Sequence, residues 1–158
     1  MNKVAAFQPL SDEELSVSPT EDTADVGEWE PITPVPQEVK RILPPHTLGK
    51  PSKVWTYEDQ EGRLLGATAR FETPGGKETR PLTYCEKGGV QEWRWKALNA
   101  PRPLYALPRL AQNPNKPVLV VEGEKAADAA QELFPDYVVT TSPMGAKAPA
   151  KAYWGHLS

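Results

Sequence analysis

The chain contains a single cysteine and no long apolar run, and both absences restrict what it can be. Cys85 is the only cysteine in 158 residues, which excludes an internal disulfide and a cysteine-based zinc site within one chain. The N-terminus lacks the apolar core of a secretory signal, and no run approaches the roughly 20 apolar residues that span a membrane. We therefore expect a soluble, cytoplasmic protein with no membrane partner.

Basic residues are almost absent from the first 39 positions, where Lys3 is the only one. The same stretch holds nine acidic residues: Asp12, Glu13, Glu14, Glu21, Asp22, Asp25, Glu28, Glu30 and Glu38. Its formal charge is −8, and because the whole chain carries −3, residues 40–158 carry +5. An acidic segment ahead of a mildly basic body is a layout found in proteins that handle nucleic acid, and in many that do not.

Proline, in contrast, is abundant, with 18 residues in the chain, about twice the usual share. Seven of them fall within residues 1–50 among the acidic clusters, and no apolar period is sustained there. Such a composition does not bury enough apolar surface to offset the entropy of ordering. The sequence predicts a disordered, acidic, proline-rich tail over residues 1–50.

From Val54 the apolar residues recur with period two, which indicates half-buried strands. Gly-containing turns near residues 59–62, 74–77 and 86–89 separate the alternating stretches. We expect an antiparallel meander of about four strands within a β-rich region over residues 51–112, with a short helix at 108–112. The apolar positions of the alternation are Trp55, Tyr57, Leu65, Ala67, Ala69, Phe71, Leu82, Tyr84, Trp93 and Trp95.

After Pro117 the pattern changes to that of an α/β unit. Residues 118–121 are continuously apolar, which is typical of a strand buried on both faces. Residues 124–134 favour a helix whose apolar side holds Ala126, Ala130, Leu133 and Phe134, and residues 137–141 favour a second strand. A strand, a helix and a strand at this spacing predict two parallel strands joined by a crossover. The fold class predicted for the whole chain is therefore α+β.

Glu122 is the main candidate functional residue. It follows the first of these strands directly, and ligands of open α/β sheets bind at the carboxyl ends of the strands. Gly123 permits a sharp turn and a close approach of the backbone to a ligand, and the helix that follows directs its free amides to the same place. The plainer interpretation is that Glu122 leaves the strand and meets water, while Glu124 favours the helix start.

The run from Val118 to Asp128 (Val-Leu-Val-Val-Glu-Gly-Glu-Lys-Ala-Ala-Asp) resembles the first motif of the Toprim domain of bacterial primases and topoisomerases. Residues 133–147 are similar to the second Toprim strand and its glycine-containing loop. More narrowly, residues 50–158 resemble the primase-helicase-like proteins of phages, plasmids and integrated elements, in which a β-rich region precedes Toprim. The resemblance makes residues 116–158 the N-terminal half of a Toprim-like domain.

This resemblance implies priming of DNA replication by nucleotidyl transfer, with single-stranded DNA and nucleotides as substrates and a helicase domain or subunit as a further partner. It makes Glu122 the general base and Gly123 its turn glycine, with Gly145 and Lys147 near phosphate. It also implies a Mg²⁺ cofactor held by an Asp-x-Asp pair on a third strand. Because no acidic residue follows Asp136, that pair is absent and Glu122 is only a weak metal candidate. We therefore expect a fragment that is inactive alone.

A rival hypothesis is a non-catalytic module that binds nucleic acid or a helicase. Arg94 and Lys96 alternate with Trp93 and Trp95, so the cations of this strand would follow a nucleic-acid backbone while exposed indoles stack on bases. The alternative for the same residues is a sheet whose tryptophan face is core and whose cationic face is solvated.

Overall fold

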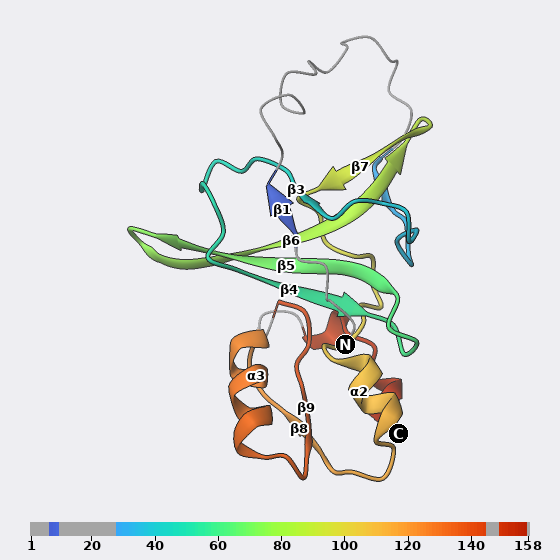
Figure 1. Cartoon of the computed structure of the whole chain (residues 1–158), viewed down its shortest axis with the longest axis vertical. Helices are drawn as coiled ribbons and strands as arrows, with labels where there is room; N and C mark the ends of the chain where they lie inside the picture. Colours follow the sequence, from blue (N-terminus) through green and yellow to red (C-terminus); the bar gives the residue numbers. More distant parts are fainter. Residues whose placement is uncertain (1–6, 10–27, 145–148, 158) are drawn as a thin grey trace.

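The computed structural model describes residues 7–9, 28–144 and 149–157 (Figure 1). It confirms the α+β class, with an antiparallel sheet and, among the described residues, two α-helices. None of these helices has the length and apolar character needed to cross a membrane.

The central element is a five-stranded antiparallel sheet. Four of its strands are β4 (Lys53–Glu58), β5 (Leu64–Thr73), β6 (Gly76–Lys87) and β7 (Val90–Arg94). They pair in chain order, β4 with β5, β5 with β6 and β6 with β7. Strand β2 (Glu30–Pro31) adds to β6, giving the order β2-β6-β5-β4 with β7 also on β6. The four-strand meander expected from the period-two pattern is thus confirmed.

One detail of the alternation differs from the sequence prediction. The pairing of β4 with β5 shifts register between Tyr57 and Glu58. A bulge of this kind changes the alternation of side chains between the two faces. Leu64 is buried as a result, and Leu65, the expected core residue, is half-buried.

Residues 28–50 do not form the solvated tail that their composition predicts. Val35 and Leu43 are buried in a cluster with Leu82 and Trp93 of the sheet, and Phe7 packs on the same cluster. Short strands β1 (Gln8–Pro9) and β3 (Ile42–Leu43) pair in parallel beside it. The few apolar residues between the prolines are enough to fix this segment, because they bury surface of the sheet that would otherwise meet water. The remainder of the predicted tail, residues 1–6 and 10–27, lies outside the described residues.

The second part of the chain contains the predicted α/β unit. After helix α2 (Leu107–Gln112) come strand β8 (Val118–Val120), helix α3 (Glu124–Leu133) and strand β9 (Val138–Thr140). Strands β8 and β9 pair in parallel, from Val118 opposite Val138 to Val120 opposite Thr140. These elements lie together below β4 in Figure 1, with the 3₁₀ turns η2 (Pro149–Lys151) and η3 (Trp154–Leu157) near α2.

Two burial predictions for this unit are wrong. Strand β8 is not buried on both faces, since Val118 is 37% and Val120 46% exposed. Among the described residues β8 pairs only with β9, which is itself buried along its whole length, so the exposed surface belongs to β8. Helix α3 leaves Leu133 and Phe134, at its C-terminal end, 73% and 47% exposed. Its buried residues are Glu124 and Ala127, because the helix faces the sheet with a polar stripe.

Candidate functional site

The turn between β8 and α3 places Glu122 at the carboxyl end of a parallel strand pair. The amide of Val121 donates to the Thr140 carbonyl at 3.0 Å, so the pairing continues to the last residue before Glu122. The Glu122 side chain is exposed. Its carboxylate is therefore free to meet a ligand at the strand ends, where open α/β sheets bind ligands.

Gly123 shapes this turn in the way that its sequence position indicates. Its φ angle is +82°, in the region that side-chain-bearing residues rarely adopt, and the space where a Cβ would lie is open. Its amide donates to Oγ1 of the buried Thr141 at 3.0 Å, which ties the turn to the end of β9. No side chain caps the start of α3, so first-turn amides remain without a side-chain acceptor.

Glu124, two residues after Glu122, has a different role. It is 6% exposed, and its Oε1 accepts a 2.7 Å hydrogen bond from the hydroxyl of Tyr57, which is 2% exposed. Burial, reinforced by the charge of Glu124 and by this bond, raises the pKa of Tyr57 well above its ordinary value. The Tyr57 hydroxyl therefore stays protonated and satisfies the buried carboxylate.

Asp128, one helical turn further along α3, accepts from two aromatic side chains. Trp55 donates from Nε1 to Oδ2 at 2.8 Å, and Tyr105 donates from its hydroxyl to Oδ1 at 2.8 Å. Lys53 approaches the same carboxylate at 3.5 Å. Burial, followed by the hydrogen bond to Asp128, raises the pKa of Tyr105. Glu124 and Asp128 thus fasten the helix, and with it the Glu122 turn, to strand β4.

The sequence analysis missed this pair of contacts, although signals for it were present. Glu124 and Asp128 are four apart and share one helix face, and Trp55 and Tyr57 are two apart and share one strand face. The spacing therefore allowed both pairs to meet. Nothing in the sequence indicated that this helix face, and not the apolar one, packs on the sheet.

Among the described residues, the structure does not bring Arg94 to the turn (Figure 1). Gly145 and Lys147 lie outside the described residues. Arg94 stacks on the ring of Trp29, 4.3 Å from its centroid, and forms an ion pair with Glu92. Strand β7, which carries Arg94, lies at the opposite end of the molecule from β8 (Figure 1).

Of the tryptophans next to Arg94 and Lys96, Trp93 is buried and Trp95 is half-buried, which favours the second of the two alternatives. Trp93 is 8% exposed and donates from Nε1 to the Lys40 carbonyl at 2.8 Å. Trp95 packs against the same core and contacts the rings of His46 and Phe71. The Trp93 indole is therefore closed to stacking on a nucleic-acid base, and the Trp95 ring is partly covered.

The described residues do not fit a complete magnesium site. No group of three Asp, Glu, His or Cys side chains comes together in this part of the chain. Near the turn, Glu124 is held by Tyr57 and Asp128 by Trp55 and Tyr105. Glu122 alone offers a free carboxylate there. Mg²⁺ is usually bound through one or two carboxylates together with substrate phosphates, so the turn supplies at most one protein ligand.

Comparison with known proteins adds no relative, since no family model, no curated protein and no solved structure matches the chain.

Proposed function

We propose that residues 116–158 form the first half of a Toprim-like domain in a DNA primase-like protein of a mobile element. The observation that carries the proposal is the position of Glu122 and Gly123, at the end of β8 and beside the end of the parallel strand β9. A general base at this position needs a carboxylate that is exposed at a strand end. The Glu122 side chain is exposed at the end of β8.

In this proposal Glu122 acts as a general base in primer synthesis. Its carboxylate accepts the proton of a primer 3′-hydroxyl while that oxygen attacks the α-phosphorus of a nucleoside triphosphate and pyrophosphate leaves. The exposed position of Glu122 admits both substrates. Glu124 and Asp128 do not take part directly, because their oxygens already accept hydrogen bonds from aromatic side chains.

The partly exposed strand β8 also supports the proposal. Strands of parallel sheets are normally covered on both sides, but Val118 and Val120 are substantially exposed. A further parallel strand added to the free edge of β8 would end next to Glu122. Metal-binding carboxylates at the end of that strand would complete the site that the described residues lack.

The experiment is to determine the gene sequence that follows codon 158. We expect an apolar strand of about five residues that ends in Asp-x-Asp, preceded by a helix that covers the exposed apolar residues of this unit. A gene that stops at this point, or continues without such a strand, would contradict the Toprim assignment.

A further inference from the structure

The backbone at Glu122 is fixed through its two neighbours in the chain, while its own side chain is free. The amide of Val121 donates to the carbonyl of Thr140 at 3.0 Å. The amide of Gly123 donates to Oγ1 of Thr141, also at 3.0 Å. The residues on both sides of Glu122 are therefore bonded to consecutive residues at the end of β9. The Glu122 carboxylate is exposed and takes part in no hydrogen bond or ion pair among the described residues.

Thr141 is the residue that ties this turn to the rest of the molecule. It is completely buried, with 0% of its surface exposed. Because its Oγ1 accepts from Gly123, its hydroxyl hydrogen is left for another acceptor, which is the Ser142 carbonyl at 3.4 Å. Its main-chain carbonyl accepts from the amide of Tyr105 at 3.0 Å. Threonine is also stiff at χ1, so the acceptor for the Gly123 amide is held in one place.

The turn has little of its own to hold it. Glycine adopts many backbone conformations, and Gly123 lies at φ 82° and ψ 158° at the start of α3. No side chain caps this helix start. Between Val121 and Glu124, the Thr141 hydroxyl is the only side-chain group among the described residues that bonds to the backbone of the turn. It supplies, from the neighbouring strand, the constraint that the local sequence lacks.

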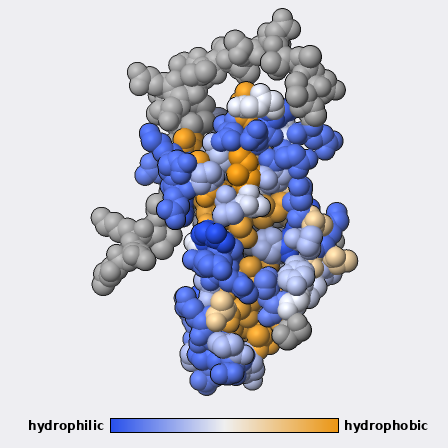
Figure 2. Space-filling model, turned by 90° about the vertical axis from the view of Figure 1, so that its right-hand side faces the viewer, coloured by the Kyte–Doolittle hydropathy of each residue, from blue (hydrophilic) through white to orange (hydrophobic). Residues whose placement is uncertain are grey.

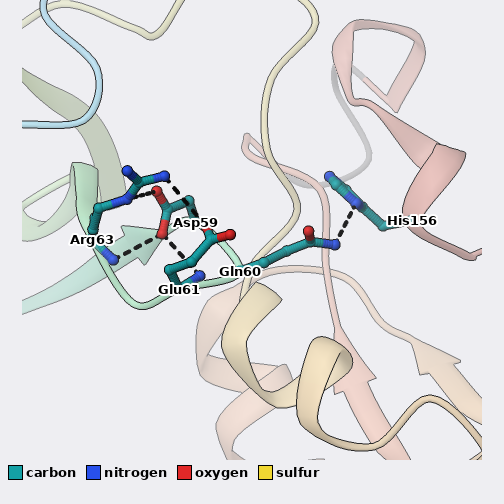
Figure 3. A network of polar contacts seen from close by, with 5 residues as sticks. All are labelled: Asp59, Gln60, Glu61, Arg63 and His156. Carbon is teal, nitrogen blue, oxygen red and sulfur yellow. Dashed lines mark hydrogen bonds and ion pairs between the residues drawn. The ribbon is translucent and has the colours of Figure 1, made fainter.

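A comparable bond holds the β4–β5 turn, but that turn uses a charged acceptor. There Oδ1 of Asp59 accepts from the amides of Glu61 and Arg63 at 3.0 and 2.9 Å (Figure 3). The other oxygen of Asp59 accepts from Nε of Arg63 at 2.6 Å, so the carboxylate has a countercharge. The neutral Thr141 hydroxyl needs no such cation. A cation beside the turn would pair with Glu122 and weaken it as a base.

The turn is also separate from the cleft on another side of the molecule. That cleft, of about 460 Å³, lies between the sheet and the C-terminal segment and is lined by Leu107 and His156, among others. Figure 2 shows the side that carries α2, where apolar side chains are exposed between hydrophilic ones. Glu122, Gly123 and Thr141 do not line the cleft. A substitution at Thr141 therefore acts on the turn and leaves the lining of the cleft unchanged.

We propose that Thr141 is a positioning residue for Glu122, an inference that rests on the priming function proposed above. By fixing the Gly123 amide, its hydroxyl sets the direction from which the Glu122 carboxylate meets a primer 3′-hydroxyl. A displacement of about 1 Å from the productive geometry lowers a rate by about 100-fold. Loss of the Thr141 hydroxyl therefore slows the chemical step, whereas binding of the nucleotide, which depends on other contacts, changes little.

The first test measures hydrogen exchange of backbone amides in this chain by NMR. In the wild type, the Gly123 amide should exchange more slowly than the Lys125 amide, which has no acceptor because α3 lacks a side-chain cap. In Thr141→Val, which keeps the shape of the side chain but not the acceptor, the Gly123 amide should exchange roughly tenfold faster. Thr141→Ser should keep the wild-type rate. The Val121 amide, bonded to Thr140, should be unchanged in both variants.

The second test is primer synthesis by the product of the full gene, with Thr140→Val as the matched control. Thr140 is as completely buried as Thr141, but its Oγ1 donates to the Tyr105 carbonyl at 2.6 Å and not to the turn. Thr141→Val should lower kcat by about 10–100-fold with little change in the KM for nucleotide. Thr141→Ser should retain the wild-type kcat. Thr140→Val should lower stability without this loss of kcat.

Three results would overturn the proposal. One is equal exchange at Gly123 and Lys125 in the wild type, a comparison that needs no folded variant. The others are a wild-type kcat in Thr141→Val and an equal loss of kcat in Thr140→Val. If Glu122→Gln is inactive while Thr141→Val synthesises normally, this inference fails alone. If Glu122→Gln also synthesises normally, the priming role of Glu122 fails as well.

Discussion

Glu122 and Glu124 are two residues apart, but the turn at Gly123 sends their side chains into different surroundings. Glu122 is exposed, while Glu124 is almost completely buried against Tyr57. A buried carboxylate is tolerated only with a partner, and the Tyr57 hydroxyl supplies one. The exposed carboxylate is consequently the one that is free to meet a ligand, and the buried one holds the turn in place.

Gly123 gives the residue-scale prediction. Gly123→Ala should lower the free energy of unfolding by about 1–3 kcal/mol, because alanine at φ 82° and ψ 158° would occupy a backbone region that essentially only glycine adopts. No neighbouring atom would clash with the added methyl group. Urea denaturation measures the loss.

Gly75→Ala is the matched control, since Gly75 lies in the β5–β6 turn without a positive φ and only Thr73 Oγ1 approaches the added methyl group, at 4.0 Å. It should change stability by much less. Equal effects of the two substitutions would show that the Gly123 turn is not held in this conformation.

At the scale of elements, helix α3 is attached to the sheet by hydrogen bonds more than by apolar packing. Its contact face consists of Glu124, Ala127, Asp128 and Gln131, at positions i, i+3, i+4 and i+7. Gln131 accepts from the Val139 amide at 3.0 Å and donates to the Tyr137 carbonyl at 2.9 Å. A helix fixed in this way keeps a defined orientation, because each bond has a directional requirement.

The Tyr57–Glu124 bond predicts how stability depends on pH. The pKa of Tyr57 is raised on folding from an ordinary value of 10.0, so the folded state holds the proton more tightly than the unfolded state. The stabilisation is complete below about pH 10 and is lost as pH rises through the folded pKa. Tyr57→Phe should lower the free energy of unfolding at pH 7 by about 1–3 kcal/mol, since Glu124 loses its donor, and should make the alkaline decline less steep.

The comparison is made by urea denaturation between pH 7 and pH 11, with Tyr137→Phe as the control. Tyr137 is 41% exposed, and its substitution should leave both the stability and the slope nearly unchanged. An alkaline decline of the same steepness in Tyr57→Phe and in the wild type would mean that the Tyr57 hydroxyl is not the group that titrates.

The order and type of the main elements could be predicted from the sequence, because period-two alternation and the strand–helix–strand spacing are local signals. The face that α3 turns toward β4 could not be predicted, because it depends on Trp55 and Tyr57 of that distant strand. These two residues bind Asp128 and Glu124. The apolar residues Leu133 and Phe134 are left exposed. The burial of Val35 and Leu43 was hidden for the same reason. Their local composition is that of a tail, and only the sheet gives them a surface to cover.

At the scale of the whole molecule, the antiparallel sheet is the support to which both other parts are attached. The segment containing Val35 and Leu43 packs on the cluster that contains Leu82. The α/β unit is fastened to β4 through Trp55 and Tyr57. The β-rich region therefore sets the position of the Glu122 turn, so the two predicted regions are structurally dependent on one another.

The measurement that tests the central claim most directly is primer synthesis by the product of the full gene, on single-stranded DNA with nucleoside triphosphates and Mg²⁺, for wild type, Glu122→Gln and Glu132→Gln. Glu132 is an exposed glutamate near the other end of α3, so its substitution repeats the chemical change away from the turn. If Glu122 is the general base, Glu122→Gln lowers the rate by about 10²–10⁴-fold and Glu132→Gln does not. Wild-type rates in Glu122→Gln would contradict the account, and salt-dependent DNA binding without any synthesis would favour a binding module instead.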